Sequence, residues 1–154
     1  MRLDGGGVTR HFYVDGTLIL KNITLTNGSA DPTGGNPWPA YCGGAVFLAS
    51  GSNGTFIGTT FMANRAQLGG AVDIEMGASG LFLDSAFISN YGSTHGGGIF
   101  LSDAGGKAYV SGTEFGNNIA GYGGNDIFNM NSDPGNVQCP STCDGEYCMT
   151  VDCY

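Results

Sequence analysis

The chain has 154 residues, and its formal net charge of −8 argues against nucleic acid and anionic lipid as partners, since both attract basic proteins. Glycine accounts for 29 residues without a triplet period, which excludes collagen, and no apolar run is long enough to cross a bilayer. Only 5 residues are lysine or arginine while 41% are hydrophobic, so we expect one domain with a narrow continuous core and many turns.

Residues 1–25 predict short strands at the start of this domain. His11-Phe12-Tyr13-Val14 is interpreted as part of an incomplete first coil that covers one end of a stack, with a structural role for His11. Residues 17–25 alternate apolar and polar side chains with a shift at a bend, which is typical of two short strands. Because the N-terminal residues resemble the middle of a repeat, we expect the chain to be a fragment or a processed product.

Residues 30–42 form an insertion with three prolines and two aromatic residues, which predicts a stiff, ordered loop. Trp38 and Tyr41 either fold over the neighbouring strands as a lid or form a binding site that stacks on sugar rings or on a partner. The lid is the favoured interpretation. Cys42 closes the insertion with no cysteine near it in sequence, so we expect its disulfide partner to be distant or in another chain.

The next part of the chain repeats one sequence. Gly43-Gly44-Ala45-Val46-Phe47-Leu48 returns with first glycines at Gly69 and Gly96, and a looser copy with one extra residue starts at Gly123. The steps between positions 43, 69, 96 and 123 are 26, 27 and 27 residues. A fixed period of this size is typical of a repeat architecture in which each repeat forms one coil.

A second motif, Phe-x-x-Asn, precedes each of three glycine pairs, and another apolar residue lies five positions before its Phe. With period-two alternation in the strands, these positions predict stacked core columns and an asparagine ladder at a turn. The paired glycines suit a turn with positive φ. The predicted columns are Val46, Val72, Ile99 and Ile127; Leu48, Ile74 and Leu101; Phe61, Phe87 and Phe115; and Leu20, Phe56, Phe82 and Val110, with the ladder at Asn64, Asn90 and Asn118.

The Gly-Gly-Ala-Val and Phe-x-x-Asn motifs resemble the repeats of the polymorphic outer membrane protein family and, more broadly, right-handed parallel β-helix proteins of the pectin-lyase-like type. The resemblance covers roughly residues 3–129. It implies an all-β solenoid and a secreted or cell-surface protein with an adhesive or structural role, and it supplies no catalytic residues. We therefore expect a right-handed parallel β-helix of about four to five coils over residues 1–130.

Several residues of the glycine-pair strands have the parity that points away from the core. Phe47, Phe100 and Phe128 share this parity and suggest a partner-contact surface, although a covering loop could bury them instead. Asp73 and Glu75 also point outward, and a solvated acidic spot is the favoured interpretation. The alternative is a carbohydrate or metal site, with Arg65 as a base or charge partner.

The last residues, 131–154, lose the repeat and predict a cysteine-rich C-terminal cap or the start of a further module. Four of the five cysteines lie here: Cys139, Cys143, Cys148 and Cys153. Together with sequons at Asn22, Asn27 and Asn53, they favour an oxidising secretory route with disulfides and glycans. A zinc site is the weaker alternative, because no CxxC knuckle and no nearby histidine accompany the cysteines.

These features predict a non-enzymatic structural or adhesive module of a secreted or cell-surface assembly, without a cofactor, a metal or catalytic residues. Other protein subunits, identical or different, are the expected partners, with glycans as a further possibility. The alternative function is a carbohydrate-binding or polysaccharide lyase-like β-helix that uses Asp73, Glu75, Trp38 and Tyr41. Neither the glycan nor the disulfide connectivity follows from the sequence.

Overall fold

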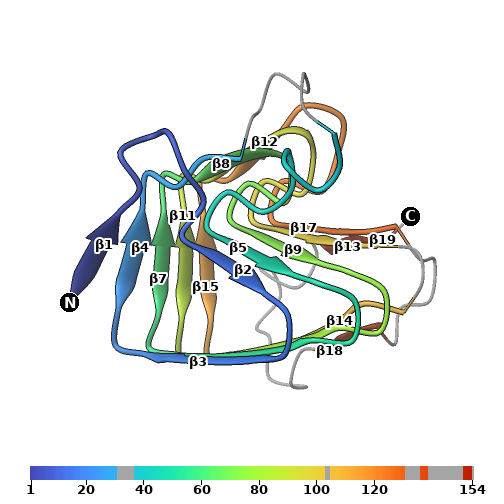
Figure 1. The fold of residues 1–154 in the computed structure, drawn as a ribbon. Helices are drawn as coiled ribbons and strands as arrows, with labels where there is room; N and C mark the ends of the chain where they lie inside the picture. The colour runs from blue at the N-terminus through green and yellow to red at the C-terminus, as the bar shows by residue number, and fades with distance from the viewer. Residues whose placement is uncertain (31–36, 103–104, 131–135, 139–150, 154) are drawn as a thin grey trace.

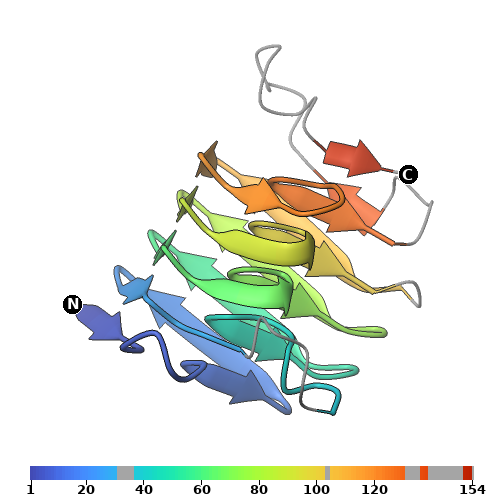
Figure 2. The ribbon, with the colours of Figure 1, turned by 90° about the horizontal axis from the view of Figure 1, so that it is seen from above.

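The computed structural model describes residues 1–30, 37–102, 105–130, 136–138 and 151–153, and every paired strand in these ranges is parallel to its neighbour. The chain is therefore all-β, and strands one repeat apart lie side by side, which is the pairing of a parallel β-solenoid. Figure 1 looks along the stack, and Figure 2 shows the successive coils from the blue N-terminal end to the red C-terminal end.

The described strands form four sheets that run along the stack. The β1 sheet holds β1 (Arg2–Asp4), β4 (Thr24–Thr26), β7 (Thr60–Met62), β11 (Ala86–Ile88) and β15 (Glu114–Gly116). The β3 sheet holds β3 (Thr17–Lys21), β6 (Asn53–Ile57), β10 (Ser79–Leu83), β14 (Lys107–Ser111) and β18 (Val137–Gln138). The β2 sheet holds β2 (Phe12–Val14), β5 (Val46–Leu48), β9 (Val72–Ile74), β13 (Ile99–Leu101), β17 (Ile127–Asn129) and β19 (Val151–Cys153). The short β8 sheet holds β8 (Arg65–Leu68), β12 (Tyr91–His95) and β16 (Ile119–Ala120).

The core consists of the predicted columns, in register. Val46, Val72, Ile99 and Ile127 are paired across four strands and are buried. Phenylalanine rings stack in the same way, with centroids 4.5 Å apart for Phe61 and Phe87 and 5.0 Å apart for Phe56 and Phe82. Leu20 pairs with Phe56 at the N-terminal end of this column, but it is only partly buried. The sequence prediction of these columns is confirmed.

The predicted asparagine ladder is also present. The backbone N–H of Asn64 donates to Oδ1 of Asn90 at 3.0 Å, and the N–H of Asn90 donates to Oδ1 of Asn118 at 3.0 Å. Each side-chain amide also donates to a carbonyl of the preceding coil, as Asn90 Nδ2 does to Phe61 O at 3.0 Å. These amides therefore satisfy backbone groups that burial would otherwise leave without partners.

Replacing Asn90 with alanine should lower the free energy of unfolding by about 3 kcal/mol, because the Asn64 N–H and the Phe61 carbonyl would lose a buried partner. Urea unfolding followed by far-UV circular dichroism measures the change. Asn53→Ala is the matched control, since Asn53 is exposed and its loss should cost less than about 0.5 kcal/mol. Equal losses for the two variants would contradict a stabilising role for the ladder.

The two glycines of each pair have different structural roles. The prediction of positive φ for the paired glycines holds only for the first glycine of each pair, with +59° at Gly43, +59° at Gly69 and +65° at Gly96. In the looser copy, the equivalent of this first glycine is Gly124, with φ +65°, because the extra residue shifts the pair by one position. The second glycine is needed for another reason, since a Cβ on Gly70 would lie 2.2 Å from the carbonyl oxygen of Gly97. Close approach of successive coils therefore requires it.

Candidate functional site

Two features of this solenoid can carry function: the outer face of the β2 sheet and the N-terminal edge of the stack. On the outer face, five residues lie in register across the sheet and form a row that we call the outward row. Its members are Tyr13, Phe47, Asp73, Phe100 and Phe128. None of them belongs to the hydrophobic core cluster, so the outward parity predicted from the sequence is correct.

The expected exposure of this row is wrong for its central members. Phe47, Asp73 and Phe100 are all buried, so Phe47 and Phe100 offer no open contact surface and Asp73 is not a solvated acidic spot. Phe128 is half-buried, against the rings of Phe100 and His95. For Phe47, the alternative of a covering loop is the one that the structure bears out.

Residues 37–43, which we call the cover segment, lie over the N-terminal half of the row. The indole of Trp38 meets the ring of Phe47 edge-on, with centroids 5.8 Å apart, while the ring of Tyr13 stacks on Phe47 with centroids 5.2 Å apart. Backbone bonds join the segment to β8, where Gln67 N–H donates to Tyr41 O at 2.9 Å and Gly43 N–H to Leu68 O at 2.8 Å. Trp38 stays 54% exposed and Tyr41 half-buried, so this part of the insertion is a lid whose aromatic side chains still reach solvent.

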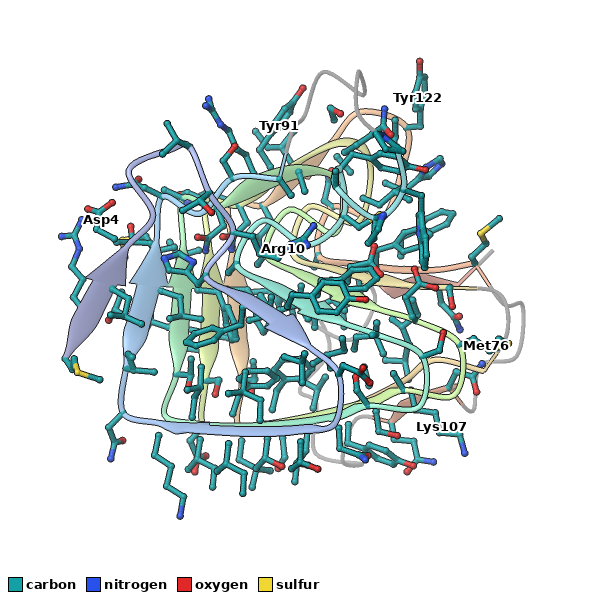
Figure 3. The ribbon with its side chains drawn as sticks, viewed as in Figure 1. Asp4, Arg10, Met76, Tyr91, Lys107 and Tyr122 are labelled. Carbon is teal, nitrogen blue, oxygen red and sulfur yellow. The ribbon has the colours of Figure 1, made fainter. Side chains whose placement is uncertain are left out.

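Arg10 fixes the cover segment in place. Its guanidinium donates to the carbonyl oxygens of Gly43 at 3.0 Å, of Pro39 at 2.7 Å and of Cys42, and it lies 5.2 Å from the centroid of the Phe47 ring. In Figure 3 Arg10 lies within the outline of the molecule, whereas Tyr122, Met76 and Lys107 point away from it. Sequence reasoning did not single out Arg10, because it belongs to no repeat and its partners lie 29 to 33 residues away.

The buried acid of the row has unusual surroundings. Asp73 is 0% exposed, and neither carboxyl oxygen has a partner with hydrogen-bonding geometry. Burial raises the pKa of Asp73 well above its usual range, and the charge of Glu75 raises it further. The thiol of Cys42 and the guanidinium of Arg10 are also near enough to influence this pKa. The neutral acid is therefore the favoured form of Asp73 in the closed structure.

Cys42 is buried and carries a free thiol in this structure, and the prediction that it pairs with a cysteine of another chain stays untested. Its side chain lies beneath the cover segment beside Asp73, and burial raises its pKa above that of an ordinary cysteine. Cys139, Cys143 and Cys148 lie outside the described residues, and of Cys153 only the strand backbone is described. The predictions for the disulfides of the tail and for its role as a cap stay untested.

Arg65, the suggested partner of Asp73, lies elsewhere. Its guanidinium donates to Gly7 O at 2.9 Å and to Ser29 Oγ at 3.3 Å, at an open hollow of about 480 Å³ that Asp4 and Asn27 also line. The cation that influences Asp73 is therefore Arg10, not Arg65. Within the described ranges, no three His, Cys, Asp or Glu side chains are grouped so that they could hold a metal ion.

The three sequon asparagines differ in accessibility. Asn22 and Asn53 are exposed, whereas Asn27 is half-buried and its amide donates to both carboxylate oxygens of Asp4, at 3.1 and 3.2 Å. In the part of the chain that is described, no helix is long and apolar enough to cross a membrane.

The N-terminal edge is the second feature. The described residues give β1, β2 and β3 a neighbouring strand on one side only. Phe12, Leu18 and Leu20 pack against the core but remain partly exposed. In the next coil, Val46 and Phe56, which pair with Phe12 and Leu20, are fully buried. His11 lies at this edge, with Nε2 3.2 Å from Leu3 O, and burial lowers its pKa. This setting agrees with the structural role expected for His11.

Comparisons with known proteins add no family: the chain matches no family model, no curated protein and no solved structure. The function of this chain is therefore argued from the sequence motifs and the geometry described above.

Proposed function

We propose that this chain is a non-enzymatic structural or adhesive module of an extracellular or cell-surface assembly. Its architecture would be a right-handed parallel β-helix of about four to five coils, of the kind found in polymorphic outer membrane proteins and pectin-lyase-like proteins, closed by a cysteine-rich C-terminal cap. The acidic composition, the clustered cysteines and the exposed sequons at Asn22 and Asn53 support a secreted glycoprotein with disulfides.

The observation that carries this proposal is the outer edge of β3, where the described residues supply no neighbouring strand. Asn22 N–H donates to Ile57 O, and Asn53 N–H to Gly16 O, so the even-numbered residues of β3 bond to β6. By strand alternation, Thr17, Ile19 and Lys21 direct their N–H and C=O groups away from β6. These groups suit pairing with an extended strand of another subunit, whose alternate apolar side chains would cover Leu18 and Leu20.

The alternative function, a polysaccharide lyase or carbohydrate-binding protein, lacks a comparable observation. It requires Asp73 and Glu75 to border one groove with Trp38 and Tyr41, but Asp73 is buried beneath the cover segment and cannot meet a substrate in this conformation. We therefore propose protein subunits as the partners, with a second copy of the chain as the first one to test.

Replacing Ile19 with proline should weaken self-association at least tenfold, measured by sedimentation velocity over a range of concentrations. Proline removes an N–H that points away from β6, so it costs no bond within the stack but blocks an added strand. Ile19→Thr is the matched control, because it removes the 58% exposed apolar side chain and keeps the N–H. A chain that stays monomeric at all concentrations, or equal behaviour of the two variants, would contradict pairing through this edge.

A further inference from the structure

The cover segment lies over the buried carboxyl group of Asp73. The segment is held by three carbonyl oxygens that accept from Arg10, and it buries an acid that has no hydrogen-bond partner of its own. A buried carboxyl without partners tolerates the neutral state far better than the ionised one. The protonation state of Asp73 and the closed position of the segment are therefore linked.

We propose that residues 37–43 are a pH-dependent cover, which closes over the outward row when Asp73 is protonated and opens when Asp73 ionises. This inference goes beyond the proposed function, because it concerns the outer face rather than the edge of the stack. Opening would uncover Phe47, an apolar ring that is fully buried in the closed structure.

The groups that face Asp73 explain why ionisation must move the cover. Its strand neighbours in the row, Phe47 on β5 and Phe100 on β13, carry no charge. Cys42 faces it from the cover segment and Glu75 from the end of β9, and neither is a cation. Arg10 is the one cation among the described groups that influence Asp73.

Arg10 cannot keep its hydrogen bonds to the cover segment and also neutralise an ionised Asp73 unless its side chain moves. Its donors are committed to the carbonyls of Pro39, Cys42 and Gly43, and its other charged or titratable neighbour of note is Tyr13 on β2. An ionised Asp73 would either draw Arg10 away from those carbonyls or admit water beneath the segment. Both routes release the contacts that keep the segment closed.

The direction of the pH effect follows from the raised pKa of Asp73. The acid is neutral in both forms below its ordinary value of 3.8, so the closed form has its full stability there. As the pH rises toward the raised pKa of the closed form, the open form gains by losing its proton, and the closed form is disfavoured. Arginine stays protonated throughout, and the raised pKa of Cys42 keeps its buried thiol neutral.

Two residues of the segment report its position. Cys42 is buried and free in the closed form, so its alkylation by iodoacetamide, followed by peptide mass mapping, measures opening. Trp38 is the one tryptophan of the sequence, so acrylamide quenching of its fluorescence gives a second readout that does not depend on thiol chemistry. Neither readout requires assembly, so a failure of this proposal is distinct from a failure of the proposed function.

We expect the alkylation rate of Cys42 in the wild type, divided by that in Asp73→Asn at the same pH, to rise at least tenfold from roughly pH 4 to pH 9. Trp38 quenching should increase with the same midpoint in the wild type and stay constant in Asp73→Asn. Glu75→Gln, the matched control, should keep the transition but move its midpoint to lower pH, since the Glu75 charge raises the pKa of Asp73.

Asp73→Leu provides a second uncharged variant if the asparagine variant does not fold, and it should also stay closed at every pH. A wild-type cover whose Cys42 and Trp38 are equally accessible at all pH values would overturn the proposal. So would a pH transition that persists in the uncharged variants.

Discussion

Replacing Gly70 with alanine should lower the free energy of unfolding by more than about 4 kcal/mol, or prevent folding, because the new Cβ has no space. It would lie 2.2 Å from the carbonyl oxygen of Gly97 and 2.6 and 2.7 Å from the backbone C and N of Tyr91. All three atoms are backbone, so relief would require β8, β12 and their turns to move apart. Urea unfolding followed by circular dichroism measures the loss.

The matched control for this prediction is Gly77→Ala. Gly77 has a φ of +66°, but no atom lies within 4 Å of the place that a Cβ would occupy, so only the left-handed backbone opposes alanine there. That conformation costs about 1–2 kcal/mol. If the two alanine variants lose equal stability, close approach between coils is not the reason for the second glycine of each pair.

Replacing Phe87 with alanine should cost about 3–5 kcal/mol, the second largest effect we expect. Its ring is fully buried and stacks on Phe61 at 4.5 Å and on Phe115 at 5.0 Å, with an edge contact to Phe82 at 5.3 Å. Alanine would leave a cavity in the middle of the column, which the rigid strand pairs on both sides cannot close.

Met62→Ala is the control for Phe87→Ala, since Met62 lies on β7 of the same sheet but is 39% exposed. It should cost less than about 1 kcal/mol by equilibrium unfolding. Comparable losses for the two variants would mean that the phenylalanine column does not determine the stability of the stack.

The columns and the asparagine ladder could be predicted because each depends on a residue type that recurs once per coil. Period-two alternation places Val72 inside and Asp73 outside, and the step of 26 to 27 residues aligns them with their neighbours. Stacking then follows from register alone. The same periodicity located the glycine pairs, but it did not distinguish the first glycine, which has positive φ, from the second, which does not.

The burial of the outward row could not be predicted, because its cause is not periodic. Parity shows that Phe47 and Asp73 leave the core, but it does not show what lies over them. The cover segment belongs to an insertion that occurs once, and Arg10 reaches it from a different coil. Contacts that occur once, between segments about 30 residues apart, leave no repeated signal, so the burial of Cys42 and of Asp73 was missed as well.

The asparagine ladder also gives the stack a direction. Asn64 Oδ1 accepts from Gly28 N–H in the coil before, and Asn64 Nδ2 donates to Asn90 Oδ1 in the coil after, so the amide dipoles point the same way. At the donor end, Asn118 Nδ2 meets the Asp126 carboxylate at 2.9 Å, which places a negative group against the positive end of the array. The ladder therefore has a fixed polarity along the stack, and it ends at Asn118, whose amide nitrogen donates both to Phe87 O and to Asp126.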